Sequence, residues 1–303
     1  MEEEAAAAAV PPIIDLGDFP NQLDGLRRAC EDWGCFRVVN HGIPEELTSD
    51  MKRVVRSLFD LPRDVKERNR DIIAGSGYMA PSEKNPLYEA LGLYDMGSSD
   101  SIHTFCSQLD ANPDQRDTIV RYAKAIHDLV MEIAARTAEC VGLRGDLFKE
   151  WPCQFRINKY CFTPQSVGSL GVQLHTDSGF LTILQEDENV GGLEVMDKTG
   201  SFVAIDPQPG TFLVNLGDMA AIWSNGKWCN VRHRVQCNSS AIRVSIATFL
   251  LGPKAEPLEA PSVFIDSESS KIYNPVEYEE YRKLRLSTKL QAGEALAFVQ
   301  CQK

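Results

Sequence analysis

The feature that most constrains the fold is a series of short apolar segments between residues 154 and 251. The segment 155–162 alternates between polar and apolar residues, as a strand with two different faces does. The later segments are short, apolar and separated by turn-forming residues: 180–185, 193–196, 202–205, 211–216, 220–224, 228–236 and 242–251. Asn225-Gly226, between two of these segments, is a strong signal for a two-residue hairpin. About eight strands at this spacing predict a double-sheet jelly roll.

The first half of the chain predicts mostly helices. Short strands are expected at 11–15 and 35–39, and helices at 22–33, from Pro44 onward, and at 113–141. Residues 71–110 are expected to be irregular, because glycine and proline interrupt any period there. Their aromatic residues suit either a binding lid or ordinary packing. A C-terminal helix is expected at 273–286, where it would close over the sheet.

These elements predict a mixed α/β fold that is mainly β. Its core is a double-stranded β-helix (jelly roll), with an N-terminal helical region and flanking helices. We expect a disordered tail at 1–10, an N-terminal helix-rich region packing on the core at 11–152, the jelly-roll core at 153–252, and a C-terminal helical extension at 253–303.

Composition narrows the possible partners and location. The chain has no apolar run of the roughly eighteen residues that a membrane-spanning helix needs, and its N-terminus lacks the basic and apolar regions of a signal peptide. Nine cysteines without C-x-x-C spacing indicate reduced thiols and a cytoplasmic protein. The net charge of −12 argues against nucleic acid as a partner, so any anion-binding site must be local.

A candidate metal site comes from three residues in two segments. His175 and Asp177 are two positions apart, so in a strand their side chains point the same way. His233 lies in a later apolar segment and supplies a third ligand. Two histidines and one carboxylate form the facial triad of non-haem Fe(II) sites, which leaves positions open for a co-substrate and dioxygen. Taken alone, the His-x-Asp pair is a weak signal that more often marks a polar loop than a metal site.

A candidate anion site follows ten residues after His233. Arg243, Ser245, Ala247 and Phe249 share one face of a strand that is otherwise apolar. An arginine facing the interior of a sandwich needs an anion, and a guanidinium beside a hydroxyl suits a dicarboxylic acid. The alternative is a surface arginine on an edge strand.

These motifs occur in an order that resembles the plant 2-oxoglutarate/Fe(II)-dependent dioxygenases. The resemblance extends over nearly the whole chain, from about residue 13 to residue 290. Besides the metal and arginine motifs, it includes Trp33-Gly-Cys-Phe-Arg-Val-Val-Asn-His-Gly-Ile-Pro44, Arg156-Ile-Asn-Lys-Tyr160, Asn215-Leu-Gly-Asp218 and Ser224-Asn-Gly226.

The resemblance implies cofactors and roles for particular residues. Fe(II), the co-substrate 2-oxoglutarate and O2 would take part, and ascorbate would help in assays. The implied iron ligands are His175, Asp177 and His233. The residues implied to bind 2-oxoglutarate are Arg243, Ser245, Tyr160 and Asn158. The implied enzyme hydroxylates a substrate and converts 2-oxoglutarate to succinate and CO2.

Three segments, 77–88, 170–177 and 215–226, look most like the auxin dioxygenases of this family. These enzymes convert indole-3-acetic acid to 2-oxindole-3-acetic acid. The resemblance also turns Arg156 inward, toward the mouth of the barrel, where it would pair with the acetate of an acidic substrate. Phe249, Phe180 and Tyr78 are the candidate walls for a flat aromatic ring. The sequence departs from the commoner family pattern at Lys159 and at 228–230, which cautions against reading the substrate from flavonoid or gibberellin enzymes.

Two other functions stay open. The same chemistry could act on another small plant metabolite, such as a gibberellin or a flavonoid. Alternatively, the chain could be a jelly-roll binding protein without catalytic activity. We expect the residues at 11–303 to work as one catalytic unit and the protein to be a monomer by default, although the sequence does not exclude an oligomer.

Overall fold

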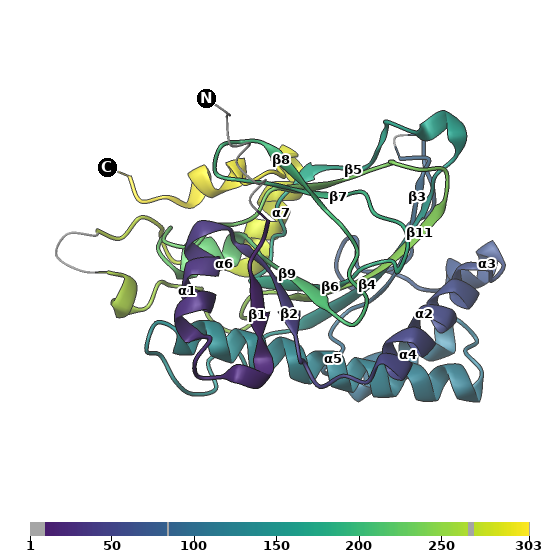
Figure 1. Ribbon diagram of the computed structural model, residues 1–303, viewed down its shortest axis with the longest axis horizontal. Helices are drawn as coiled ribbons and strands as arrows, with labels where there is room; N and C mark the ends of the chain where they lie inside the picture. The colour runs from purple at the N-terminus through teal and green to yellow at the C-terminus, as the bar shows by residue number, and fades with distance from the viewer. Residues whose placement is uncertain (1–9, 84, 266–269, 303) are drawn as a thin grey trace, which may run out of the picture.

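The structure is a computed structural model that describes residues 10–83, 85–265 and 270–302. The predicted tail at 1–10 therefore lies outside the described residues, apart from Val10. The chain forms three layers, with helices beneath a large sheet and a smaller sheet above it (Figure 1). Within the described ranges, no helix is both long and apolar enough to cross a membrane.

The large sheet has seven strands in the order β1-β2-β9-β6-β11-β4-β3. Its strands are β1 (Ile13–Asp15), β2 (Cys35–Val39), β3 (Tyr88–Leu93), β4 (Cys153–Cys161), β6 (Leu181–Gln185), β9 (Phe212–Leu216) and β11 (Ile242–Leu250). All neighbours are antiparallel except β1 and β2. The small sheet has the order β5-β10-β7-β8. Its strands are β5 (Leu170–His175), β7 (Leu193–Met196), β8 (Phe202–Ile205) and β10 (His233–Gln236). Two facing sheets confirm the predicted jelly roll.

Helices cover the outer face of the large sheet. The longest, α5 (Pro113–Glu139), begins at a capping box formed by Asn112 and Gln115 and buries one apolar stripe. It packs against the sheet and against α1 (Leu23–Asp32), α2 (Glu45–Phe59) and α4 (Ser99–Gln108). The remaining helices are α3 (Arg63–Lys66), α6 (Asp218–Trp223), α7 (Tyr278–Thr288) and short 3₁₀ turns at Leu16–Asp18, Pro164–Ser166, Ser262–Phe264 and Glu294–Val299.

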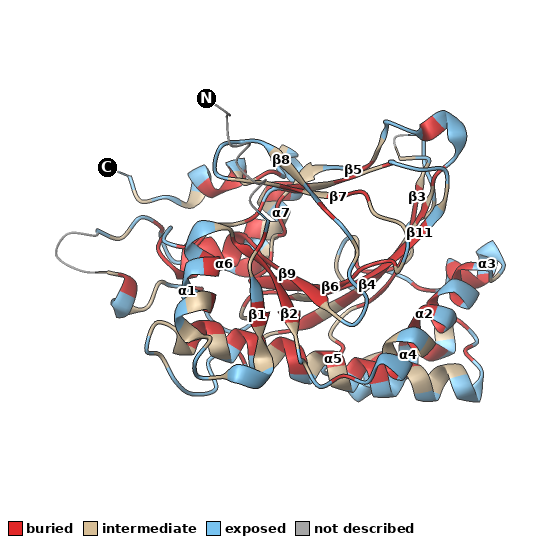
Figure 2. Cartoon of the chain, in the orientation of Figure 1, coloured by how far each residue is buried: buried red, intermediate tan, exposed pale blue. Residues whose placement is uncertain are grey.

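Strands β6 and β9, in the middle of the large sheet, are buried at every residue and therefore on both faces (Figure 2). One apolar cluster fills the space between this sheet and the helices, with Val244 and Ile246 of β11 among its members. A second, smaller cluster lies between the two sheets and includes Tyr160, Leu184 and Val235. Because successive residues of a strand point to opposite faces, β4 and β11 contribute to both clusters. The candidate site lies in the second cluster.

The prediction that residues 71–110 are irregular is wrong for two stretches, which form β3 and α4. Strand β3 pairs with β4 along its whole length, so it is held by tertiary contacts rather than by its own propensity. Gly92, which suggested a break, sits where the strand approaches Ser76. A Cβ on Gly92 would come 1.9 Å from the Ser76 carbonyl oxygen, so only glycine fits.

The predicted strand at 220–224 is also wrong, since these residues belong to α6 and its C-cap. Asn225 and Gly226 have positive φ angles of 51° and 78°, the conformation a tight hairpin would need. Here they end a helix instead, and the Gly226 amide donates to the Ala221 carbonyl at 2.8 Å. The C-terminal helix is present as α7, at Tyr278–Thr288, and lies over one end of the sheets.

Candidate active site

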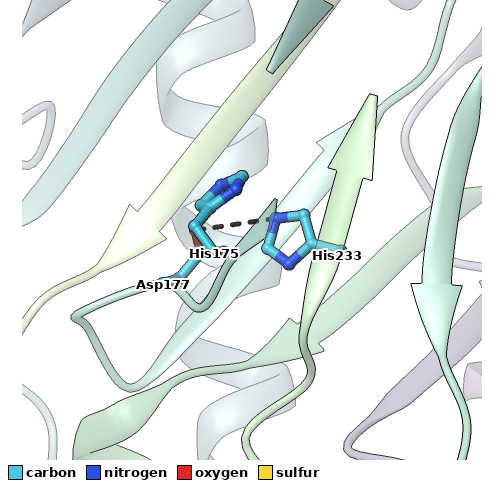
Figure 3. Close-up of side chains that lie close together, drawn as sticks. All are labelled: His175, Asp177 and His233. Atoms are coloured by element: carbon cyan, nitrogen blue, oxygen red, sulfur yellow. Dashed lines mark ion pairs between the residues drawn. The ribbon is translucent and has the colours of Figure 1, made fainter. Parts of the chain in front are cut away.

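His175, Asp177 and His233 converge at one end of the space between the sheets. His175 is the last residue of β5, His233 is the first residue of β10, and the two are directly opposite in the antiparallel ladder. Their ring centroids are 4.2 Å apart. Asp177 follows β5, and its Oδ1 lies 3.8 Å from the Nε2 atom of each histidine. One ligand atom from each residue falls within 4.8 Å of the other two. Figure 3 shows the three side chains lying close together.

Hydrogen bonds orient each of these three side chains. Nδ1 of His175 lies 2.8 Å from the Gln173 carbonyl, and Nδ1 of His233 lies 3.3 Å from the Val231 carbonyl. A protonated Nδ1 leaves Nε2 as the lone-pair atom, and in both rings Nε2 is the atom facing Asp177. Thr182 donates to Asp177 Oδ2 at 2.5 Å, which leaves Oδ1 turned toward the histidines.

The protonation states suit a divalent metal. Burial, followed by the neighbouring His233, lowers the pKa of His175 to about 4, so its imidazole is neutral near pH 7. A neutral imidazole offers a lone pair, and a metal ion would offset the charge of the nearby carboxylate. Two imidazoles and one carboxylate on one side of a cavity are the donor set preferred by non-haem Fe(II). The three residues therefore fit the implied metal.

Arg243 lies on β11 at the opposite end of the same space. It is 1% exposed, faces Tyr160 across the β11–β4 ladder, and donates from Nη1 to Ser245 Oγ at 3.3 Å. Its guanidinium carbon is 5.1 Å from the centre of the Tyr160 ring. Its Nε has no hydrogen-bond partner among the described residues. Since an unpaired buried guanidinium is costly, the site fits an anionic ligand such as the far carboxylate of 2-oxoglutarate.

Tyr160 and Asn158 complete this end of the cavity. They lie on β4 beside Arg243 and Ser245, so the predicted shared face of 156, 158 and 160 is present. Burial raises the pKa of Tyr160 to about 12, although Arg243 acts in the opposite direction. The phenol is therefore protonated at neutral pH and can donate a hydrogen bond.

A cavity of about 190 Å³ joins the two ends. Its lining brings together nine of the predicted site residues: His175, Asp177, His233, Arg243, Ser245, Tyr160, Asn158, Arg156 and Phe249. Asn215 Oδ1, which also lines it, is another buried polar atom without a partner in the described part of the chain. Two unpartnered polar groups in one cavity indicate a polar ligand.

Two of the predicted substrate residues lie elsewhere. Phe180 is fully buried in an aromatic cluster, with its ring centre 4.8 Å from that of Phe148 and 5.5 Å from that of Trp223. Its prediction as a substrate wall is wrong because its side chain points into the core beneath the sheet. Tyr78 does not line the cavity either, since its hydroxyl donates to Glu89 at 2.8 Å.

Arg156 lies at the mouth with a partner that the sequence did not reveal. Its Nε donates to the Tyr88 hydroxyl at 3.0 Å, and that hydroxyl donates to Asn158 Oδ1 at 2.7 Å. The other guanidinium contacts are the Gly75 carbonyl and the Met79 sulfur, the latter at 3.8 Å. All of these partners are uncharged. Tyr88 belongs to β3, within the segment predicted to be irregular, so no strand period pointed to it.

An outer cavity of about 260 Å³ adjoins the inner one and shares Arg156, Asp177 and Phe249 with it. Arg282 and Tyr278 of α7 line the outer cavity, together with Gly75. Ala247 also lines the inner cavity, on the face predicted for it beside Arg243. The remaining inner-wall residues that the sequence missed are Val172, Thr182, Leu184, Leu193 and Val235. All of them lie on strands of the two facing sheets, where the face toward the cavity could have been derived only from the pairing of the strands.

Comparisons with known proteins agree with this geometry. A model of the 2OG-Fe(II) oxygenase superfamily matches residues 151–252, and a model described as the N-terminal region of non-haem dioxygenases in morphine synthesis matches residues 11–115. The 2-oxoglutarate-dependent dioxygenase DAO of Oryza sativa subsp. japonica is 53% identical over 292 residues, covering 94% of this chain and 97% of that protein. Naringenin,2-oxoglutarate 3-dioxygenase of Callistephus chinensis is 31% identical and covers 92% of this chain and 82% of its own length.

Two solved structures are similar over most of the chain. Dioxygenase for auxin oxidation 1 of Arabidopsis thaliana, in complex with 2-oxoglutarate, has a TM-score of 0.84 and 58% identity, covering 86% of this chain and 100% of that one. The rice dioxygenase for auxin oxidation has a TM-score of 0.91 and 51% identity, covering 96% of this chain and 100% of that one. Since its identity to a relative exceeds one half over nearly the full length of both, this chain belongs to the 2OG-Fe(II) oxygenase superfamily and is one of its 2-oxoglutarate-dependent dioxygenases.

Proposed function

We propose that this enzyme oxidises indole-3-acetic acid to 2-oxindole-3-acetic acid, with release of succinate and CO2, and thereby inactivates auxin. The relatives described as dioxygenases for auxin oxidation support this substrate. The observation that carries it is the position of Arg156, a cation with only uncharged partners at the mouth of the cavity. Arg156 lines both the inner and the outer cavity, so a small acid that enters through the outer cavity would meet this guanidinium on its way to the candidate metal site.

The proposed metal ligands are His175, Asp177 and His233. When bound, Fe(II) supplies the oxidising chemistry with O2. The protein holds the three donors on one side and orients them through the Gln173, Val231 and Thr182 contacts. The buried apolar walls at Leu184, Leu193 and Val235 would limit the water around the reacting groups.

The proposed site for 2-oxoglutarate is the opposite end of the cavity. Arg243 would pair with the carboxylate farthest from the metal, and Ser245 and the protonated Tyr160 hydroxyl would donate hydrogen bonds. Asn158, whose Oδ1 already accepts from Tyr88, would present its amide nitrogen. The length of the cavity thereby fixes which end of 2-oxoglutarate meets the metal.

The proposed substrate contacts are Arg156 and Phe249. The two line both the inner and the outer cavity, so they lie on the path between solvent and the metal site. Arg156 would bind the acetate, and the Phe249 ring would pack on the flat indole. Here we place the carboxylate at the mouth and the ring toward the metal, because Arg156 lies at the outer end.

We also propose that residues 11–152, 153–252 and 253–303 act as one catalytic unit, and that the enzyme works as a cytoplasmic monomer. The nine cysteines are all unpaired, which supports a reducing compartment.

The test is turnover of indole-3-acetic acid by purified protein with Fe(II), ascorbate and 2-oxoglutarate. We expect a product heavier by one oxygen atom and an equal amount of succinate. If succinate forms with a gibberellin or a flavonoid but not with indole-3-acetic acid, the proposed substrate is wrong and the proposed reaction type is right. An iron-loaded protein that forms no succinate with any of them would instead be a binding protein.

The substrate anchor has its own test in Arg156→Ala. This variant should lose far more activity toward indole-3-acetic acid than toward indole-3-acetamide, which lacks the carboxylate. Arg144→Ala, at an exposed arginine outside the cavity lining, is the matched control and should leave both activities unchanged. Equal losses on the two substrates would reject Arg156 as the anchor.

A further inference from the structure

Arg285 and Asp218 form a buried ion pair beside the candidate metal ligands. Asp218 is fully buried and Arg285 is 7% exposed, and Nη1 of Arg285 donates to Asp218 Oδ2. Asp218 also accepts from the Tyr281 hydroxyl at 2.7 Å and from Asn230 Nδ2 at 2.7 Å. The pair thus links α7 to the start of α6.

The same arginine holds the residue between the two ligands of the His-x-Asp motif. Nη2 of Arg285 donates to the Thr176 carbonyl at 2.7 Å, and Nη1 donates to the Thr176 hydroxyl at 3.2 Å. The amide of Thr176 donates to the Gln291 carbonyl at 2.8 Å, and Arg285 donates to that same carbonyl at 2.9 Å. Thr176 is therefore fixed at its amide, carbonyl and side chain by the C-terminal region.

Asp218 holds the other side of this turn through its backbone. Its amide donates to the Asp177 carbonyl at 2.8 Å, and the next amide, of Met219, donates to the Gly179 carbonyl at 3.0 Å. The approach is so close that a Cβ on Gly217 would lie 2.7 Å from the Asp177 carbonyl oxygen. The backbone from Thr176 to Gly179 is thus hydrogen-bonded to the C-terminal region on one side and to the start of α6 on the other. The Arg285–Asp218 ion pair joins these two regions.

We propose that Arg285 is a positioning residue for the metal site. With Asp218 as its counter-charge, it sets the backbone at Thr176, and so fixes the separation and direction of His175 and Asp177. It touches no ligand side chain, and acts through the main chain between them. The proposal rests on the assignment of His175, Asp177 and His233 as metal ligands.

Arg285→Lys and Tyr281→Phe separate positioning from general stability. Lysine keeps a positive charge near Asp218, but it lacks the planar fork whose two nitrogens reach Asp218 and the Thr176 carbonyl together. Tyr281→Phe removes one hydrogen bond from the same carboxylate and leaves the Arg285–Thr176 contacts in place. The two variants therefore disturb one network, and only one of them releases the turn.

The measurement is Mn(II) binding to the metal-free protein by titration calorimetry, alongside the melting temperature of each variant. Arg285→Lys should weaken Mn(II) binding by about tenfold, the order seen when residues that orient metal ligands are changed. Tyr281→Phe should lower the melting temperature with Mn(II) affinity within about twofold of the wild type. Thr176→Val removes the hydroxyl contacts with Arg285 and with the Gln291 carbonyl and keeps the main-chain contacts. It should weaken binding roughly threefold, and it serves as the test if Arg285→Lys does not fold.

Unchanged Mn(II) affinity in Arg285→Lys, or in Thr176→Val where it carries the test, would overturn the positioning role. Equal losses of affinity in Arg285→Lys and Tyr281→Phe would do the same, because they would mark a general loss of structure. A wild-type protein that binds no Mn(II) would instead overturn the assignment of the three ligands, and the positioning role with it.

Discussion

Arg37 and Arg243 are both buried arginines of the large sheet, with 5% and 1% exposure, but their surroundings differ. Arg37, on β2, pairs with Glu186 at 2.6 Å, and also donates to the Thr211 hydroxyl at 2.8 Å and the Asp206 carbonyl at 3.0 Å. Arg243 has a serine hydroxyl at 3.3 Å and an Nε without a partner in the described part of the chain.

The difference separates a structural charge from a binding charge. Where the protein itself supplies the anion, removing the arginine strands a buried carboxylate and weakens the fold. Where the donors of a buried arginine have no partner, the arginine destabilises the empty protein. It stabilises the complex once an anion binds in the cavity. Residue type and burial are the same for a structural arginine and a binding arginine. The two differ in whether every guanidinium donor has a hydrogen-bond partner within the protein.

The largest effect on stability is expected for Arg37→Met. Glu186 would be left as a buried carboxylate without its ion pair, at a cost of about 3–5 kcal/mol in the free energy of unfolding. Urea unfolding of the metal-free protein measures this, with Arg243→Met as the matched control that should lose little or gain stability. If Arg243→Met loses as much as Arg37→Met, the contrast between the two arginines fails.

A smaller and different effect is expected for Arg243→Met. The variant should bind 2-oxoglutarate more weakly by about 2–4 kcal/mol, because a desolvated carboxylate loses its partner. The apparent affinity in the succinate assay measures the loss, and Mn(II) binding to the same variant should stay normal. An unchanged affinity for 2-oxoglutarate would show that another group holds its carboxylate.

The third prediction concerns pH. Burial raises the pKa of Glu186 above its usual value, while Arg37 acts to lower it. Without Arg37 the pKa of Glu186 must rise further, so in the variant this carboxyl takes up a proton as the pH falls. A neutral carboxyl costs less free energy to bury than a charged one. The stability deficit of Arg37→Met should therefore be larger at about pH 7.5 than at about pH 5.5. A deficit that is constant or grows toward acid would contradict the ion-pair explanation.

The smallest effect is expected for Ser245→Ala. Removing one neutral hydroxyl beside Arg243 should weaken 2-oxoglutarate binding by about 0.5–1.5 kcal/mol and leave the fold intact. Comparing the apparent 2-oxoglutarate affinities of Ser245→Ala and Arg243→Met measures how much of the binding free energy comes from the charged guanidinium and how much from the hydroxyl. A loss as large as that of Arg243→Met would mean that the hydroxyl, and not the guanidinium, is the main contact.

Much of the candidate site was predictable because strand period is a local property. Arg243 and Ser245 share a direction within β11, whatever that strand pairs with. His175 ends β5 and Asp177 lies beyond it, so their convergence depends on the turn after the strand. The segment 220–224 could not be assigned in the same way. All of its residues are buried, so its apolar run carries no period that separates a short helix from a strand.

Other errors came from contacts between distant segments. Phe180 is close to Asp177 in sequence, yet its ring points to the other side of the sheet, and no pattern of neighbours encodes that direction. Tyr88 reaches the cavity only because β3 pairs with β4, a pairing across some seventy residues. Arg285 comes from a helix whose existence was predictable, but its docking beside Thr176 was not.

The pairing of β3 with β4 brings the N-terminal region of the chain to the mouth of the cavity. Residues 11–115 carry the first β-strands of the catalytic sheet, and through Tyr88 they also set the partner of Arg156. On the proposed assignment of Arg156, residues 11–115 therefore influence the choice of substrate, although none of the proposed iron or 2-oxoglutarate contacts lies among them. Replacing this stretch with that of a relative should therefore change which acids the enzyme accepts, while the proposed iron ligands, which all lie later in the chain, stay the same.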